Sequence, residues 1–262
     1  MRYTLIGSGT VVPDARRGPA AHHFACGDIQ VLCDLGSGTI RRLDELGLPW
    51  PELDMVAVTH RHQDHIADLL PLLFALRHTP GVERVRPLTL LGYEGFARDL
   101  TLLSEVYGGW VLDPGFPLEV RERPDTPLEI ERGDAWLEIE SRPVVHSPEA
   151  VGYRITLSAS GREVVVAYTG DTEESAEAIN LARDADLLVS ECSVADEDRV
   201  PGHLTPRGAG RVAAAASVGR LVTTHFYPSA LALGPEEIER RIREAYAEGA
   251  VDLGVDGLRI DL

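Results

Sequence analysis

The feature that most constrains the fold of this chain is the cluster His60-Arg61-His62-Gln63-Asp64-His65, which follows directly after the apolar run Met55–Thr59. The apolar run is rich in β-branched residues and predicts a buried strand, so the cluster lies at a strand end, where open α/β sheets place ligand sites. In an extended backbone His60 and His62 point the same way, whereas Asp64 and His65 turn to a neighbouring point. Imidazole and carboxylate groups suit divalent metals, so the cluster predicts two metal centres that share one loop.

Further metal ligands are expected elsewhere in the chain, because each metal ion needs about four to six donors. Three other short apolar runs end on a residue of ligand type, namely His146, Asp171 and His225. Taken singly, His146 is more often a structural histidine, and Asp171 also fits an N-cap for a helix that starts near Ser175. The repetition of the same pattern at several strand ends favours the interpretation as ligands.

These residues give the pattern His-x-His-x-Asp-His followed by a distant His, an Asp and a final His, and in this the chain resembles the metallo-β-lactamase fold hydrolases over nearly its whole length. The resemblance implies two zinc ions, with Mn²⁺ or Fe²⁺ as alternatives. It also implies the ligand sets: His60, His62 and His146 for one ion, Asp64, His65 and His225 for the other, and Asp171 as a bridge. The β-lactam-cleaving enzymes have a thiolate at the position of Asp171. Asp34 matches a family acid that organises the site from beneath, and it fits a turn carboxylate equally well.

Two more residues suggest a subgroup. Glu191 ends another apolar run, and His203 precedes Thr205 and Pro206, which fit the N-cap and first turn of an Ala-rich helix. With this pair the chain resembles ribonuclease Z, and the resemblance implies that His203, oriented by Glu191, donates a proton to the leaving group. In the mechanism that we expect, Asp64 guides the attacking hydroxide. Read alone, Glu191 is a surface acid and His203 a loop histidine.

The chain also departs from ribonuclease Z. Those proteins usually insert a tRNA-gripping arm between the residues that match His146 and Asp171, where this chain has only 24 residues, and their Ser-rich phosphate-contacting stretch is replaced here by Arg16–Ala21. The 25 Lys and Arg are outnumbered by 42 Asp and Glu, for a net charge of −17, whereas a tRNA footprint is usually basic. Two bound cations would still attract a small anion. We therefore expect a small anionic substrate rather than tRNA.

The order of elements predicts an α/β protein with an αββα sandwich. Strands are expected near residues 2–6, 21–26, 29–33, 55–59 and 88–92. Helices are expected near 38–46, 66–78 and 94–106, and a second set from 136 to 262 repeats the theme. Pro71 requires the helix at 66–78 to kink or to start later. The stretch Pro114–Asp134 is expected to be a surface connection or a short hairpin. No linker or repeat divides the chain, so residues 1–262 are expected to form a single domain.

The cysteine and lysine content and the lengths of the apolar segments limit the possible chemistry and the cellular compartment. Cys26, Cys33 and Cys192 have no paired metal spacing and fit a reducing compartment, with Cys192 interpreted as a small buried residue. The chain has no lysine, which excludes lysine nucleophiles. No apolar segment approaches about 18 residues, so we expect a cytoplasmic protein without a membrane partner. Isolated histidines are interpreted as hydrogen-bonded surface residues: His22, His23 and His78.

These patterns together predict a binuclear zinc hydrolase, a phosphodiesterase related to ribonuclease Z that acts on a small phosphodiester or an RNA 3′ end. A sulfatase, lactonase or thioesterase would use the same seven ligands with a different pocket, and the pair of Glu191 and His203 is the feature that favours a phosphodiester. A non-catalytic metal-binding sensor module is a third alternative, against which the complete ligand set argues. The resemblance to ribonuclease Z also suggests a homodimer.

Overall fold

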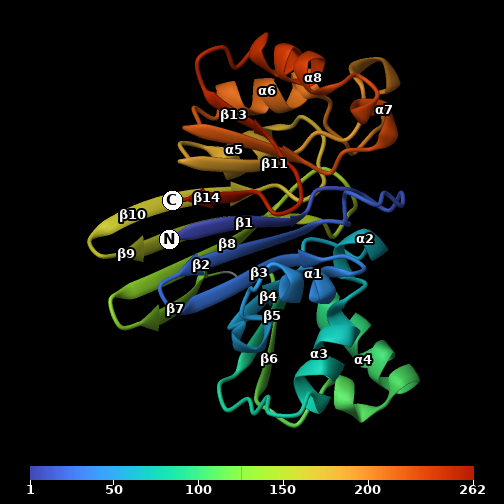
Figure 1. Ribbon diagram of the computed structural model, residues 1–262, viewed down its shortest axis with the longest axis vertical. Helices are drawn as coiled ribbons and strands as arrows, with labels where there is room; N and C mark the ends of the chain where they lie inside the picture. Colours follow the sequence, from blue (N-terminus) through green and yellow to red (C-terminus); the bar gives the residue numbers. More distant parts are fainter. Residues whose placement is uncertain (125) are drawn as a thin grey trace.

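Two mixed β-sheets packed face to face form the centre of the computed structural model, which describes residues 1–124 and 126–262 (Figure 1). In spatial order the strands of the first sheet are β14 (Arg259–Asp261), β1 (Arg2–Gly7), β2 (Ala21–Cys26), β3 (Ile29–Leu35), β4 (Met55–Ala57), β5 (Leu88–Gly92) and β6 (Leu118–Glu122). Those of the second sheet are β13 (Ala250–Leu253), β12 (Arg220–Thr224), β11 (Leu187–Glu191), β10 (Arg162–Tyr168), β9 (Val151–Ala159), β8 (Ala135–Pro143) and β7 (Leu128–Arg132).

Helices cover the outer face of each sheet (Figure 1). The first half of the chain contributes α1 (Thr39–Glu45), α2 (Gln63–Ile66), α3 (Leu69–His78) and α4 (Phe96–Tyr107), with short 3₁₀ turns η1 (Trp50–Glu52) and η2 (Gly109–Val111). The second half contributes α5 (Ala176–Ala182), α6 (Pro206–Ala215), α7 (Pro228–Leu231) and α8 (Pro235–Arg243), with η3 (Asp196–Asp198). None of the helices in the described residues is long and apolar enough to cross a bilayer.

Three apolar clusters hold these layers together. One lies between the sheets and includes Phe24 and Ile155, the second joins the second sheet to helices through Leu181, and the third joins the first sheet to helices through Leu73 and Leu100. Burying a side chain of this size stabilises the fold by about 1.5–3 kcal/mol. The α/β class and the αββα sandwich expected from the sequence are confirmed.

Two segments differ in part from the form expected from the sequence. The helix expected at 66–78 begins later, as α3 at Leu69, which places Pro71 in the first turn, where its missing N–H has no helical partner to lose. The segment Pro114–Asp134 is largely exposed and is a connection, as one of the two expectations has it, but β6 and β7 do not form a hairpin with each other. Within it, β6 pairs in parallel with β5 at the edge of the first sheet, and β7 pairs with β8 at the edge of the second. This segment therefore carries the chain from one sheet to the other.

The carboxyl ends of several parallel strands meet at one end of the sandwich. Strands β3, β4 and β5 run parallel in the first sheet, and β10, β11 and β12 run parallel in the second. The loop after β4 contacts the second sheet directly. Val151 N donates a hydrogen bond to Thr59 O at 3.0 Å, and Tyr153 Oη donates one to Val58 O at 2.7 Å. Side chains that follow β4 and β10 are thereby brought to the same place.

Candidate metal centre

The loop after β4 places four potential ligands within a few residues. His60 is buried at the strand end, His62 is the N-cap residue of α2, and Asp64 and His65 lie in the single turn of that helix, where both are buried. The turn is closed by a hydrogen bond of 3.0 Å from His65 N to His62 O. This local fold separates the ligand cluster into two pairs that face different points, as the sequence spacing predicts.

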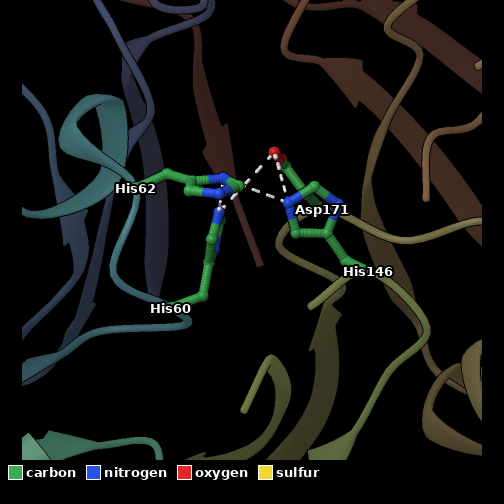
Figure 2. A group of neighbouring side chains, drawn as sticks. All are labelled: His60, His62, His146 and Asp171. Atoms are coloured by element: carbon green, nitrogen blue, oxygen red, sulfur yellow. Dashed lines mark hydrogen bonds and ion pairs between the residues drawn. The ribbon is translucent and has the colours of Figure 1, made fainter. Parts of the chain in front are cut away.

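The first ligand group gathers His60, His62, His146 and one oxygen of Asp171 (Figure 2). His62 Nδ1 lies 3.0 Å from His60 Nε2 and 3.1 Å from His146 Nε2. Asp171 Oδ2 lies 3.8 Å from His60 Nε2 and 3.9 Å from His146 Nε2. His62 is exposed and His146 half-buried, so this group opens toward solvent.

The second ligand group gathers Asp64, His65, His225 and the other oxygen of Asp171. His225 Nε2 lies 3.3 Å from both His65 Nε2 and Asp64 Oδ2. Asp171 Oδ1 lies 3.3 Å from His65 Nε2 and 3.5 Å from His225 Nε2. The two carboxylate oxygens of Asp171 thus face one group each, which is the geometry of a bridging ligand.

The two groups fit divalent cations better than they fit a network of hydrogen bonds. Zinc–nitrogen bonds of 2.0–2.1 Å in a tetrahedron separate the ligand atoms by about 3.3 Å, close to the spacing seen here. Asp171 Oδ1 is buried and accepts no hydrogen bond from the described residues, an arrangement that is costly unless a cation lies beside it. Burial lowers the pKa of both His60 and His62, which keeps these imidazoles neutral and able to coordinate.

Asp34 lies beneath the second group and orients one of its histidines. Its carboxylate accepts hydrogen bonds from Thr59 N at 2.8 Å, from Thr59 Oγ1 at 2.9 Å, from His65 Nδ1 at 2.7 Å and from Tyr168 Oη at 2.6 Å. With its proton on Nδ1, His65 presents the lone pair of Nε2 to the site. The structure therefore favours an organising role for Asp34 over a simple turn carboxylate.

Backbone and hydroxyl groups orient two other histidines. His146 Nδ1 donates to Gly202 O at 2.9 Å, and His225 Nδ1 lies 2.9 Å from Ser193 Oγ. Gly202 has φ of 81°, and a Cβ at this position would lie only 2.9 Å from His146 Nδ1. His225 itself has φ of 57°, a left-handed conformation that costs a non-glycine residue of order 1–3 kcal/mol and is common in functional sites.

Glu191 and His203 lie together at the edge of the two groups. His203 Nδ1 donates to the buried Glu191 Oε2 at 3.1 Å, and Glu191 Oε1 accepts from Thr172 N at 2.6 Å. The His203 ring lies 4.9 Å from the ring of His146 and 6.0 Å from that of His225. Burial lowers the pKa of His203, but the hydrogen bond and charge of Glu191 raise it more, to about 9. Glu191 is therefore not a surface acid, and His203 does lie in a loop but is bonded to Glu191.

Sequence reasoning missed the residues that surround the ligands. Ser193 Oγ also donates to Glu191 Oε2 and so joins Glu191 to His225. Tyr227 packs against His203 and His225, and burial together with the nearby acids, first among them Asp64, raises its pKa to about 12. Their closeness in sequence to predicted site residues could have indicated them. Ser193 comes two residues after Glu191, and Tyr227 comes two residues after His225.

The expectation that the isolated histidines lie on the surface is wrong for two of the three. His78 is exposed, as expected, but His22 and His23 are buried. Strand β2 lies inside the first sheet with both faces covered, which leaves no solvent-facing side for these rings. The three cysteines are buried, which confirms the interpretation of Cys192.

Comparison with known proteins agrees with this geometry. A family model described as "Beta-lactamase superfamily domain" matches residues 30–226, a span that holds all seven candidate ligands. The chain belongs to the β-lactamase superfamily. This match confirms the resemblance to metallo-β-lactamase fold hydrolases inferred from the sequence. Proteins named ribonuclease Z are among the relatives of this chain.

Two curated relatives of this superfamily member cover most of its length. Ribonuclease Z of Mycobacterium bovis is 30% identical, with 100% of this chain and 98% of that protein covered. The probable metallo-hydrolase YhfI of Bacillus subtilis is 31% identical, with 86% of this chain and 87% of that protein covered. Among solved structures, YhfI aligns with a TM-score of 0.77 at 26% identity over 99% of this chain and 98% of that one. The short form of human tRNase Z has a TM-score of 0.73 at 22% identity over 100% and 99%, a likeness of fold.

Proposed function

We propose that this protein is a binuclear metal-dependent phosphodiesterase that acts on small anionic phosphodiesters. The observation that carries the proposal is the placement of Asp171 between two ligand groups, with the pair of His203 and Glu191 at their edge. When bound, two divalent cations, zinc in preference to Mn²⁺ or Fe²⁺, would activate a water molecule and offset negative charge that develops in the transition state. The relatives named ribonuclease Z support a phosphodiester as the substrate class.

The roles of individual residues follow from their positions. Asp64 has one oxygen directed at His225, and its carboxylate is placed to orient the attacking water. His203 carries a proton near neutral pH and lies at the more open side of the site, where it would protonate the departing alkoxide. General acid catalysis of this kind contributes about 10²–10⁴-fold in rate. Glu191, buried and fixed by Thr172 N, holds the His203 ring in place.

Charge and local topology support a small substrate over tRNA. The net charge of −17 opposes a polyanion at long range. The hairpin of β9 and β10 occupies most of the segment between His146 and Asp171, where ribonuclease Z would carry its arm. The half-buried His146 and exposed His62 leave access to a small ester group at the first ligand group.

A substrate panel tests the proposal. The metal-loaded protein should hydrolyse bis(4-nitrophenyl) phosphate and dinucleotides faster than sulfate esters, lactones or thioesters, and faster than precursor tRNA. Metal analysis of the same sample should give two ions per chain. Turnover of a lactone or thioester without phosphodiester turnover would overturn the substrate class, and a fully metal-loaded protein without any turnover would favour a sensor module.

A further inference from the structure

Tyr227 occupies a fixed position directly beside the candidate centre. It is the N-cap residue of α7, and Pro228 in the first turn restricts the backbone that follows. Tyr227 N donates to Ser193 O at 2.9 Å, and the preceding Phe226 N donates to Ser8 O at 3.2 Å. Two hydrogen bonds from separate parts of the chain therefore hold the turn that carries the side chain.

The Tyr227 ring stands perpendicular to two imidazoles of the site. Its centroid lies 5.9 Å from that of His203 and 5.7 Å from that of His225, with interplanar angles of 69° and 75°. The rings of His203 and His225 are themselves nearly parallel, 6.0 Å apart. The Tyr227 ring therefore packs against both the proposed proton donor, His203, and a ligand of the second group, His225.

The hydroxyl of Tyr227 is the part of this side chain that no contact explains. Five of the seven tyrosines have hydrogen-bonded hydroxyls: Tyr3, Tyr93, Tyr153, Tyr168 and Tyr246. Tyr107 lies on α4 with 57% of its surface exposed. Tyr227 is half-buried, and its hydroxyl, which solvent can reach, has no hydrogen-bond partner among the described residues. A half-buried donor beside a catalytic centre is suited to an atom of the bound ligand.

We propose that Tyr227 contacts the substrate, its hydroxyl donating a hydrogen bond to a non-bridging oxygen of the phosphodiester. This inference rests on the proposed function. A phenol, with an ordinary pKa of about 10, is neutral at neutral pH, so it can donate without adding charge to a site already lined by acids. His203 and Tyr227 lie side by side, so one would address the leaving-group oxygen and the other a neighbouring oxygen of the same phosphoryl group. Donors aimed at phosphoryl oxygens act where negative charge is concentrated in the transition state.

Tyr227→Phe removes the hydroxyl and keeps the ring. Because a hydrogen bond to a charged group contributes about 1.5–3 kcal/mol, kcat for bis(4-nitrophenyl) phosphate should fall about 10- to 150-fold while both metals remain bound. Tyr107→Phe makes the same chemical change at an exposed site and should leave kcat unchanged. Phosphorothioate diesters add a selective readout, since sulfur is a poor acceptor. One diastereomer should be slower than the oxygen ester in the wild type, and this ratio should shrink in Tyr227→Phe.

Binding of inorganic phosphate separates this inference from the proposed function. Calorimetry on the metal-loaded protein should show a Kd for phosphate about tenfold weaker in Tyr227→Phe than in the wild type or Tyr107→Phe. An equal Kd and turnover within twofold would overturn the substrate contact, and so would a loss of activity explained by lost metal. Absence of phosphodiester turnover in the wild type would instead overturn the proposed function, and the phosphate Kd would still decide the role of Tyr227.

Discussion

Tyr168 Oη donates a hydrogen bond of 2.6 Å to Asp34 Oδ2, the same oxygen that accepts from His65 Nδ1. Tyr168 ends β10 in the second sheet and Asp34 lies on β3 in the first, so this bond crosses the sandwich directly beneath the candidate centre. The bond from Tyr168 holds the Asp34 carboxylate in place, and that carboxylate in turn orients the His65 ring. The packing of the two sheets is thereby linked to the geometry of the second ligand group.

Tyr168→Phe should weaken the second metal site and spare the first. Loss of an outer hydrogen bond typically costs about 10- to 100-fold in metal affinity, and the lower end applies here because Thr59 still bonds Asp34. Titration with Co²⁺, followed by its absorption spectrum, should show one unchanged and one weakened step. Tyr246→Phe, which removes a buried hydroxyl bonded to Val218 O, is the control. Two unchanged steps in Tyr168→Phe would contradict this role.

His203→Ala should affect substrates according to their leaving group. Without a proton donor, turnover of diesters with alkoxide leaving groups should fall by about 10²–10⁴-fold, whereas 4-nitrophenolate leaves without protonation and its esters should lose much less. Metal content should stay at two ions per chain, because His203 belongs to neither proposed ligand set. Equal losses of turnover on both ester types would contradict the assignment of His203 as a general acid.

Gly202→Ala should disturb the first ligand group. Gly202 has φ of 81°, and an added Cβ would lie 2.9 Å from His146 Nδ1, so His146 must shift. Gly161→Ala is a matched control, because φ there is 75° and nothing lies within 4 Å of the added Cβ. Both variants should lose about 1–3 kcal/mol of stability through backbone strain. Only Gly202→Ala should also bind the first metal more weakly in calorimetry, and equal affinities in the two variants would show that His146 tolerates the shift.

His23 should make the protein less stable in mild acid. Burial lowers its pKa from 6.5 to about 4, so between these values the unfolded chain binds more protons than the folded one. The free energy of unfolding therefore falls as pH drops through this window, by about 2 kcal/mol between pH 7.5 and pH 5 from His23 alone. Urea denaturation of His23→Gln should show a correspondingly smaller loss over that range. The exposed His78→Gln should keep the wild-type loss, and identical losses in all three proteins would contradict this assignment.

The positions of four candidate ligands could be anticipated because each ends an apolar run: His60, His146, Asp171 and His225. Parallel strands of a sheet have their carboxyl ends at one edge, so residues such as His60, Asp171 and His225 come together once β4, β10 and β12 form. The later start of the helix before Pro71 followed from the same kind of local rule, since proline cannot occupy the interior of a helix without cost.

Other features depend on contacts that sequence patterns do not encode. Ser193, Tyr168 and Tyr227 are ordinary residue types whose roles arise only from the side chains that the fold places beside them. His22 and His23 look like surface residues because imidazole is polar, yet β2 is covered on both faces. The crossing from β6 to β7 was missed because two short strands separated by a Pro-containing turn fit a hairpin equally well.

Anomalous diffraction from a crystal grown with zinc tests the central claim most directly. Two peaks about 3.5–4 Å apart are expected on either side of the Asp171 carboxylate. One should lie about 2.0–2.1 Å from the coordinating nitrogens of His60, His62 and His146, and the other at that distance from those of His65 and His225. A single peak, or peaks away from Asp171, would contradict the account.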